Sequence, residues 1–129
     1  YAQAHYNLGY TYNRLGKLKK AIESYKQAIG INPDHALAHY NLGYTYNSLG
    51  KYEEVIESLK QAIRINPDNA DAHHNLGCAY RKTGEYQEAI ASYKQAIRLD
   101  PDYAWVQKDI EAIEMEGDAG NQAWRDFLK

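Results

Sequence analysis

The stretch His5-Tyr6-Asn7-Leu8-Gly9 returns 34 residues later as His39-Tyr40-Asn41-Leu42-Gly43, and again as His73-His74-Asn75-Leu76-Gly77. Each copy is followed by an Asn-Pro-Asp or Asp-Pro-Asp segment centred on Pro33, Pro67 or Pro101. A fixed period of this length indicates a unit that cannot bury its apolar face alone and stacks on its neighbours. The sequence therefore predicts a solenoid of three units.

Two helices are predicted in each unit. In the first unit, apolar and aromatic residues recur at helical spacing between Ala2 and Gly16 and again between Lys19 and Ile31. Gly16, like Gly50 and Gly84 in the later units, follows the first helix, where a left-handed backbone is often required. Proline follows the second helix and disfavours helical backbone in the preceding residue. Each unit is expected to be a helical hairpin.

Glycine and histidine also recur inside the first helices. Gly9, Gly43 and Gly77 would each cost about 1 kcal/mol relative to alanine if they were exposed, so they indicate close packing between helices. His5, His39 and His73 lie one per unit, about one packed helix or roughly 10 Å apart, too far to share a metal ion. We expect these histidines to pack. A two-ligand metal site at His35 and His39 is the weaker alternative.

The same positions resemble the tetratricopeptide repeat (TPR). Its pattern W-x2-L-G-x2-Y, A-x3-F and P appears in the first unit as His5-x2-Leu8-Gly9-x2-Tyr12, Ala21-x3-Tyr25 and Pro33. The other two units carry the pattern in register, with histidine for the usual large aromatic residue and Val55 for a small one. The resemblance covers residues 2 to 103 and implies an all-α, right-handed superhelical solenoid of three TPR hairpins.

The repeat pattern changes after Pro101. Val106, Ile110 and Ile113 are expected on one buried face of a C-terminal capping helix. The segment Gly117-Asp118-Ala119-Gly120 predicts a helix end, followed by a short tail helix with Trp124, Phe127 and Leu128 on one side. We therefore predict a single domain over residues 1–129, with repeats 2–35, 36–69 and 70–103, a capping helix at 104–116 and a tail at 117–129, whose position stays open.

The resemblance implies that the first helix of each hairpin lines a concave, peptide-binding groove. Tyrosine offers a large contact area at low entropic cost, and an asparagine amide can donate to and accept from a peptide backbone. The alternatives are that the asparagines bond to neighbouring helices and that the tyrosines complete the core. The predicted groove residues are Tyr6, Asn7, Tyr10, Asn13, Leu37, Tyr40, Asn41, Tyr44, Asn47, His74, Asn75, Cys78 and Arg81.

The predicted function is that of a protein-interaction module that binds a peptide segment of a partner protein. No phosphate-binding glycine loop, Gly-x-Ser-x-Gly turn or Cys/His pair with an orienting partner occurs, so we expect no catalytic residue, cofactor, metal site or enzymatic activity. Two alternatives remain open. The chain could form a homo-oligomeric scaffold, or it could be the substrate-recruiting arm of a larger enzyme such as a glycosyltransferase.

Charge and hydropathy exclude some classes of binding partner. A net charge of −2 argues against nucleic-acid binding, and no apolar run reaches the 18 residues that a membrane helix needs. A single cysteine, Cys78, fits a reducing compartment, so a cytoplasmic location is expected. TPR domains that clamp acidic chaperone tails use Lys, Arg and Asn at five positions, which are here Tyr6, Tyr10, Asn41, Asp71 and Asn75. Only Asn41 matches, and Asp71 would repel carboxylates, so we expect no carboxylate clamp.

The two ends of the chain carry opposite charge. Residues 1–34 contain five basic and two acidic residues, whereas residues 100–129 contain three basic and eight acidic ones. The first repeat also lacks an N-terminal cap, which would leave the apolar edge of its hairpin open. Head-to-tail stacking, or docking of the tail onto a neighbour, would cover that edge.

Overall fold

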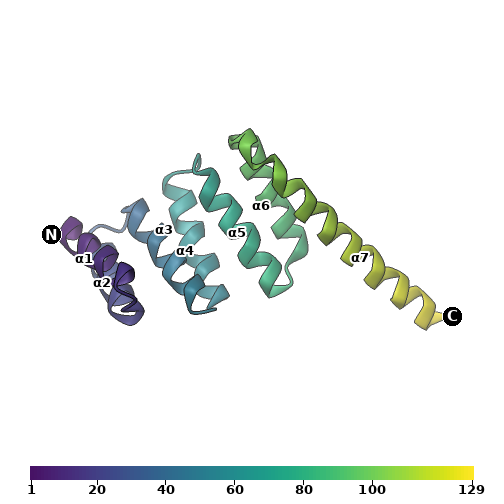
Figure 1. The fold of residues 1–129 in the computed structure, drawn as a ribbon, viewed down its shortest axis with the longest axis horizontal. Coiled ribbons are helices and arrows are strands. Elements are labelled where there is room, and N and C mark those ends of the chain that lie inside the picture. Colours follow the sequence, from purple (N-terminus) through teal and green to yellow (C-terminus); the bar gives the residue numbers. More distant parts are fainter.

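The computed structural model describes the backbone of residues 1–129 and the side chains of residues 1–116 and 126–129. Three antiparallel helical hairpins follow one another along the long axis of the molecule, and the two termini lie at opposite ends (Figure 1). The predicted all-α solenoid is confirmed. The elements are α1 (Ala2–Arg14), α2 (Leu18–Ile31), α3 (Ala36–Ser48), α4 (Tyr52–Ile65), α5 (Ala70–Thr83), α6 (Tyr86–Leu99), the 3-10 helix η1 (Pro101–Val106) and α7 (Gln107–Leu128).

The turns inside the hairpins follow the predicted chemistry. Gly16, Gly50 and Gly84 have φ angles of 74°, 70° and 82°, in the region that glycine adopts without a steric penalty. Between hairpins, His35 Nδ1 accepts a hydrogen bond from the Ala38 amide at 3.1 Å and thereby caps α3. Asn69 Oδ1 caps α5 in the same way, at 3.1 Å from the Ala72 nitrogen.

The recurring histidines fasten the loops between hairpins. The Nε2 atom of His39 lies 2.9 Å from the carbonyl oxygen of Pro33, and that of His73 lies 2.9 Å from the carbonyl oxygen of Pro67. Because a carbonyl only accepts, the ring N–H donates in both cases. The structural role expected for these histidines is confirmed for His39 and His73, and it consists of a hydrogen bond to the preceding loop. That of His5 stays a prediction.

The glycines inside the first helices mark the closest approach of the two helices in a hairpin. A Cβ atom added to Gly9 would lie 2.7 Å from the ring of Tyr25, and one added to Gly77 would lie 2.7 Å from the ring of Tyr93. In the second hairpin the neighbour of Gly43 is Leu59, at 3.2 Å. Close helix packing at these positions is confirmed, and the second hairpin differs from the other two.

The last two elements close the core at the C-terminal end. The side chains of Val106, Ile110 and Ile113 are at most 1% exposed, which confirms the predicted capping face. The expected break at Gly117–Gly120 is wrong, because the backbone of α7 stays helical to Leu128. Glycine only weakens a helix, and no proline interrupts this one. The grouping predicted for Trp124 falls outside the side chains that the structure describes.

The first hairpin exposes a face that the later hairpins bury. Leu8 is 44% exposed, whereas the equivalent Leu42 and Leu76 are 6% and 7% exposed. In those two cases the preceding hairpin packs on the helix that carries the leucine. The exposed Leu8 lies on α1. Among the described residues, no helix is both long enough and apolar enough to cross a membrane.

Candidate functional site

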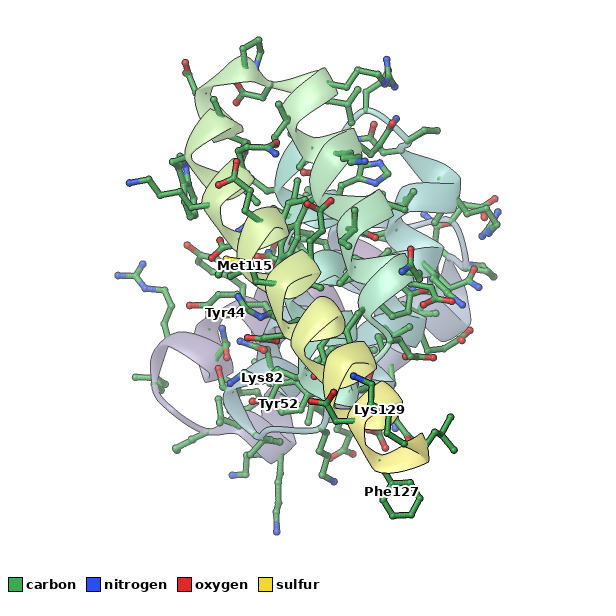
Figure 2. All side chains as sticks on the ribbon, turned by 90° about the vertical axis from the view of Figure 1, so that its right-hand side faces the viewer. Tyr44, Tyr52, Lys82, Met115, Phe127 and Lys129 are labelled. Atoms are coloured by element: carbon green, nitrogen blue, oxygen red, sulfur yellow. The ribbon has the colours of Figure 1, made fainter. Side chains whose placement is uncertain are left out.

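The thirteen predicted groove residues lie on α1, α3 and α5, the first helices of the three hairpins, and none of them is fully buried. We call the surface that they form the groove. In Figure 2, which looks along the solenoid from its C-terminal end, Tyr44 of α3 and Lys82 of α5 project on the same side of α7. Asn7, Tyr10, Leu37, Tyr44 and Asn47 are exposed, and Tyr6, Asn13, Tyr40, Asn41, His74, Asn75, Cys78 and Arg81 are half-buried.

Hydrogen bonds between tyrosine and asparagine join successive hairpins across the groove. The amide nitrogen of Asn41 donates to the hydroxyl of Tyr6 at 2.9 Å, and that of Asn75 donates to the hydroxyl of Tyr40 at 3.1 Å. Since each hydroxyl accepts from the amide, its own proton stays available for another acceptor. We call these two pairs the Tyr–Asn ladder. The ladder confirms the structural alternative for Asn41 and Asn75, which bond to the neighbouring hairpin. Their binding role stays a prediction.

Other predicted residues do not join the ladder. Asn7 accepts a hydrogen bond from Gln3 of its own helix at 3.0 Å, and Tyr10 lies under the guanidinium of Arg14, 6.0 Å from ring centroid to Cζ. Asn13 accepts from the hydroxyl of Thr45 at 3.3 Å. Leu37 is 55% exposed and belongs to none of these contacts.

A pocket of about 140 Å³ opens between α3, α4 and α5. Two apolar side chains of α4, Val55 and Leu59, line it and are only 2% and 1% exposed. Four predicted groove residues surround it, whereas Val55 and Leu59 are not among the residues predicted for the groove. The central pocket is lined by Gly43, Tyr44, Asn47, Val55, Leu59, Asn75 and Cys78.

An aromatic cluster closes the groove at the C-terminal end. The imidazole of His74 lies 5.2 Å from the ring of Tyr103 and 5.3 Å from that of Trp105, measured between centroids. The Tyr103 hydroxyl also bonds to the carboxylate of Asp71. Sequence reasoning missed Tyr103 and Trp105 as groove neighbours. The repeat phase, which continues past Pro101, is the signal that could have found them.

The cap helix restrains the last predicted groove residue. The guanidinium of Arg81 lies 3.5 Å from a carboxylate oxygen of Asp109 and 3.3 Å from one of Glu116, both on α7. A second cavity of about 550 Å³ lies beside this ion pair and is lined by His74, Cys78 and Trp105, among others. Arg81 therefore ties α7 to α5 and is not a free cation for a ligand.

The polar groups at this end influence one another. The hydrogen bond with Cys78, at 3.7 Å between Sγ and Nε2, raises the pKa of His74. Burial alone would raise the pKa of the Cys78 thiol, but hydrogen bonds from His74 and Tyr93 lower it. Burial and the nearby Asp71 carboxylate raise the pKa of Tyr40, and the hydrogen bond from Asn75 partly offsets that rise.

The described residues contain no group of three or more side chains that could hold a metal ion. The two histidines considered as a weak pair are already engaged. His35 caps α3 through Nδ1 and contacts Gln3 through Nε2 at 3.3 Å, and His39 bonds to Pro33. The groove presents hydroxyl, amide and aromatic groups.

Sequence comparison decides the family. The family profile described as TPR repeat matches residues 9–50 and 43–83, and the one described as tetratricopeptide repeat matches residues 70–103. The chain belongs to the tetratricopeptide repeat family. TPR proteins are, in general, interaction modules and not enzymes.

Solved TPR structures share the arrangement. A crystal structure of MamA is 28% identical with a TM-score of 0.85, covering 98% of this chain and 69% of that one. Another MamA structure is 32% identical with a TM-score of 0.75, and the match spans 80% of this chain but only 60% of the MamA chain. The first TPR of Spaghetti (RPAP3), solved with an HSP90 peptide, is 21% identical with a TM-score of 0.82, covering 89% and 91% of the two chains. No curated protein sequence matches this TPR chain significantly.

Proposed function

We propose that this TPR chain binds a peptide segment of a partner protein in its groove, and that the Tyr–Asn ladder reads the peptide backbone. The supporting observation is the direction of the two ladder bonds, in which Asn41 donates to Tyr6 and Asn75 donates to Tyr40. Each pair then presents a hydroxyl proton and a carboxamide oxygen. A peptide backbone offers the complementary carbonyl and N–H groups.

Aromatic surface supplies the rest of the binding free energy. Tyr10 and Tyr44 are 48% and 55% exposed, so a bound segment can cover much of each ring. A micromolar complex requires about 8 kcal/mol, and burial of a large apolar side chain contributes about 1.5–3 kcal/mol before ordering costs. A few such contacts together with the ladder are enough for weak, exchangeable binding.

The charge of the groove sets the kind of peptide. The RPAP3 domain was solved with an acidic HSP90 peptide. Because the two sequences are only 21% identical, the comparison supports a shared fold and not a shared ligand. Here Asp71 faces the groove end through its bond to Tyr103, where it would repel a carboxylate. The chaperone-tail clamp therefore stays excluded from our proposal.

Two double variants test the proposed groove. A partner captured by the wild-type protein should lose affinity in Tyr6→Ala/Tyr40→Ala, which removes ring surface and hydroxyls. It should lose less in Tyr6→Phe/Tyr40→Phe, which removes only the hydroxyls. Tyr52→Ala, on α4 and outside the groove, is the control. Calorimetry that finds equal affinity in all four proteins contradicts groove binding.

Self-association is the second candidate, and the opposite charges of residues 1–34 and 100–129 favour it. Leu8 and Leu15 on the basic first repeat are 44% and 65% exposed. We expect the acidic end of a second copy to dock on this surface. Light scattering at low and high salt tests the idea, and Leu8→Lys should keep the protein monomeric. A monomer at every concentration and salt level rules it out.

A third candidate places the chain as the recruiting arm of a larger enzyme. The match to the second MamA structure above spans only 60% of that chain, so that chain is longer than the region that this one matches. In this case the groove would bind the enzyme's substrate protein. The sequence flanking this chain in its gene decides whether a catalytic domain is attached.

A further inference from the structure

The central pocket lies in the one repeat that has a leucine where the other two have a tyrosine ring. Tyr25 and Tyr93 press their rings against Gly9 and Gly77, with a Cβ built on either glycine 2.7 Å from the ring. At the equivalent place the second repeat has Leu59, which leaves Gly43 a looser neighbour at 3.2 Å. A leucine side chain cannot reach where the outer part of a phenol ring would lie.

The volume left open matches an aromatic ring. The pocket measures about 140 Å³, close to the roughly 150 Å³ of an engineered protein cavity that stays dry and binds benzene. Val55, which replaces the Ala21 and Ala89 of the other repeats, occupies part of the space without filling it. The protein therefore has a ring-sized site at the middle of its groove.

We propose that the central pocket is a subsite for the phenylalanine side chain of a bound peptide. This inference rests on the proposed groove function and adds the identity of an anchor residue. The lining of the pocket includes Tyr44, Asn47 and Cys78, which belong to the groove. Asn75 of the Tyr–Asn ladder also lines the pocket, so the backbone of an anchored residue would lie beside a ladder pair.

The floor of the pocket discriminates phenylalanine from tyrosine. A ring that enters from the groove points its far edge at Val55 and Leu59, which are 2% and 1% exposed. A hydroxyl there would be buried without a partner, and such a group is unfavourable. Of the protein's own tyrosines at this repeat position, Tyr93 avoids this cost because its hydroxyl donates to Cys78 Sγ at 3.4 Å. The buried hydroxyl of Tyr25 has no partner among the described residues and carries the cost.

Small probes test the subsite without any knowledge of the partner. N-acetyl-phenylalanine methylamide should shift the amide resonances of Gly43, Leu59 and Cys78 in a ¹⁵N-labelled protein. The tyrosine analogue should bind about tenfold more weakly, and the alanine analogue should cause no saturable shift. Equal binding of the three analogues would overturn the proposal.

Two variants complete the experiment. Val55→Ala/Leu59→Tyr reproduces the residues of the other two repeats, so this variant should fold normally. Its affinity for the phenylalanine probe should be lower than that of wild type by at least about tenfold. Leu49→Tyr makes the same chemical change on an exposed residue outside the pocket and should bind like wild type. Undiminished binding in the pocket-filling variant overturns the subsite.

The outcomes also separate this proposal from the proposed function. If the probe binds wild type but not the filled variant, the subsite holds even when the Tyr6/Tyr40 variants leave partner capture unchanged, and only groove capture fails. If partner capture depends on Tyr6 and Tyr40 but the probe does not bind, the groove function holds and the phenylalanine subsite is wrong.

Discussion

The hydroxyl of Tyr6 accepts a hydrogen bond from the Asn41 side chain at 2.9 Å, and Tyr40 repeats this with Asn75 at 3.1 Å. Both bonds join one hairpin to the next. In a solenoid each repeat contacts only its neighbours, so bonds of this kind contribute to the interface free energy that couples the repeats. The same side chains thus stabilise the stack and form its groove.

A double-mutant cycle should detect the Tyr40–Asn75 bond. We expect Tyr40→Phe, Asn75→Ala and the double variant to give a coupling free energy of about 0.5–1.5 kcal/mol in urea unfolding, the usual net worth of such a bond. Tyr44→Phe combined with Asn75→Ala is the control, because Tyr44 is 55% exposed and makes no ladder bond. Additive effects in the Tyr40 cycle would show that the bond contributes nothing.

Alanine should be tolerated differently at two equivalent glycines. At Gly77 the new Cβ would lie 2.7 Å from the Tyr93 ring, so we expect Gly77→Ala to lower the free energy of unfolding by about 1–3 kcal/mol. At Gly43 the contact is 3.2 Å, from Leu59. The better helix propensity of alanine, about 1 kcal/mol, should offset most of that cost. Equal effects in urea unfolding would contradict the packing difference.

The buried hydroxyl of Tyr25 should be dispensable. Tyr25 is 0% exposed, and its hydroxyl has no hydrogen-bond partner in the part of the chain that the structure describes. Removal of a buried, unpaired polar atom relieves a cost of about 1–3 kcal/mol, so Tyr25→Phe should raise the thermal midpoint. Tyr93→Phe removes a paired hydroxyl and should not. A lower midpoint for Tyr25→Phe would mean that its hydroxyl does find a partner.

Ionisation of Tyr25 should contribute to a loss of stability in alkaline solution. Burial raises the pKa of Tyr25 from 10.0 to about 12. The unfolded chain then loses this proton first, so the free energy of unfolding decreases as the pH rises from about 10 towards 12. One proton corresponds to at most about 1.4 kcal/mol per pH unit. Urea unfolding at several pH values should show a shallower decline for Tyr25→Phe, and identical slopes would contradict the raised pKa.

The hairpins could be predicted from sequence because each depends on local rules. Gly16 requires a left-handed backbone, and Pro33 ends a helix wherever it occurs. The interruption expected at Gly117–Gly120 was wrong because a weakened helix is not a broken one. A glycine inside a helix costs only about 1 kcal/mol relative to alanine. A pair of glycines therefore does not show from sequence alone whether the helix ends there.

The groove was predictable as a surface but not as a set of contacts. The resemblance implied that the first helix of each hairpin lines the groove. The Tyr6–Asn41 bond could not be predicted, because it depends on how neighbouring hairpins are displaced relative to each other. The central pocket depends on a single difference, Leu59 in place of Tyr25 and Tyr93. That difference is visible in the sequence, but its consequence needs the distance to Gly43.

The capping face of α7 should carry much of the stability at the C-terminal end. Ile110 is 0% exposed, and truncation of a buried isoleucine to alanine costs about 2–5 kcal/mol. Met115, on the same helix, is 71% exposed, so Met115→Ala is a matched control that should change little. Because repeats couple only to neighbours, the loss in Ile110→Ala should appear first in hydrogen exchange of α6 and α7. Uniform destabilisation of α1 to α7 would instead show that the solenoid unfolds as one cooperative unit.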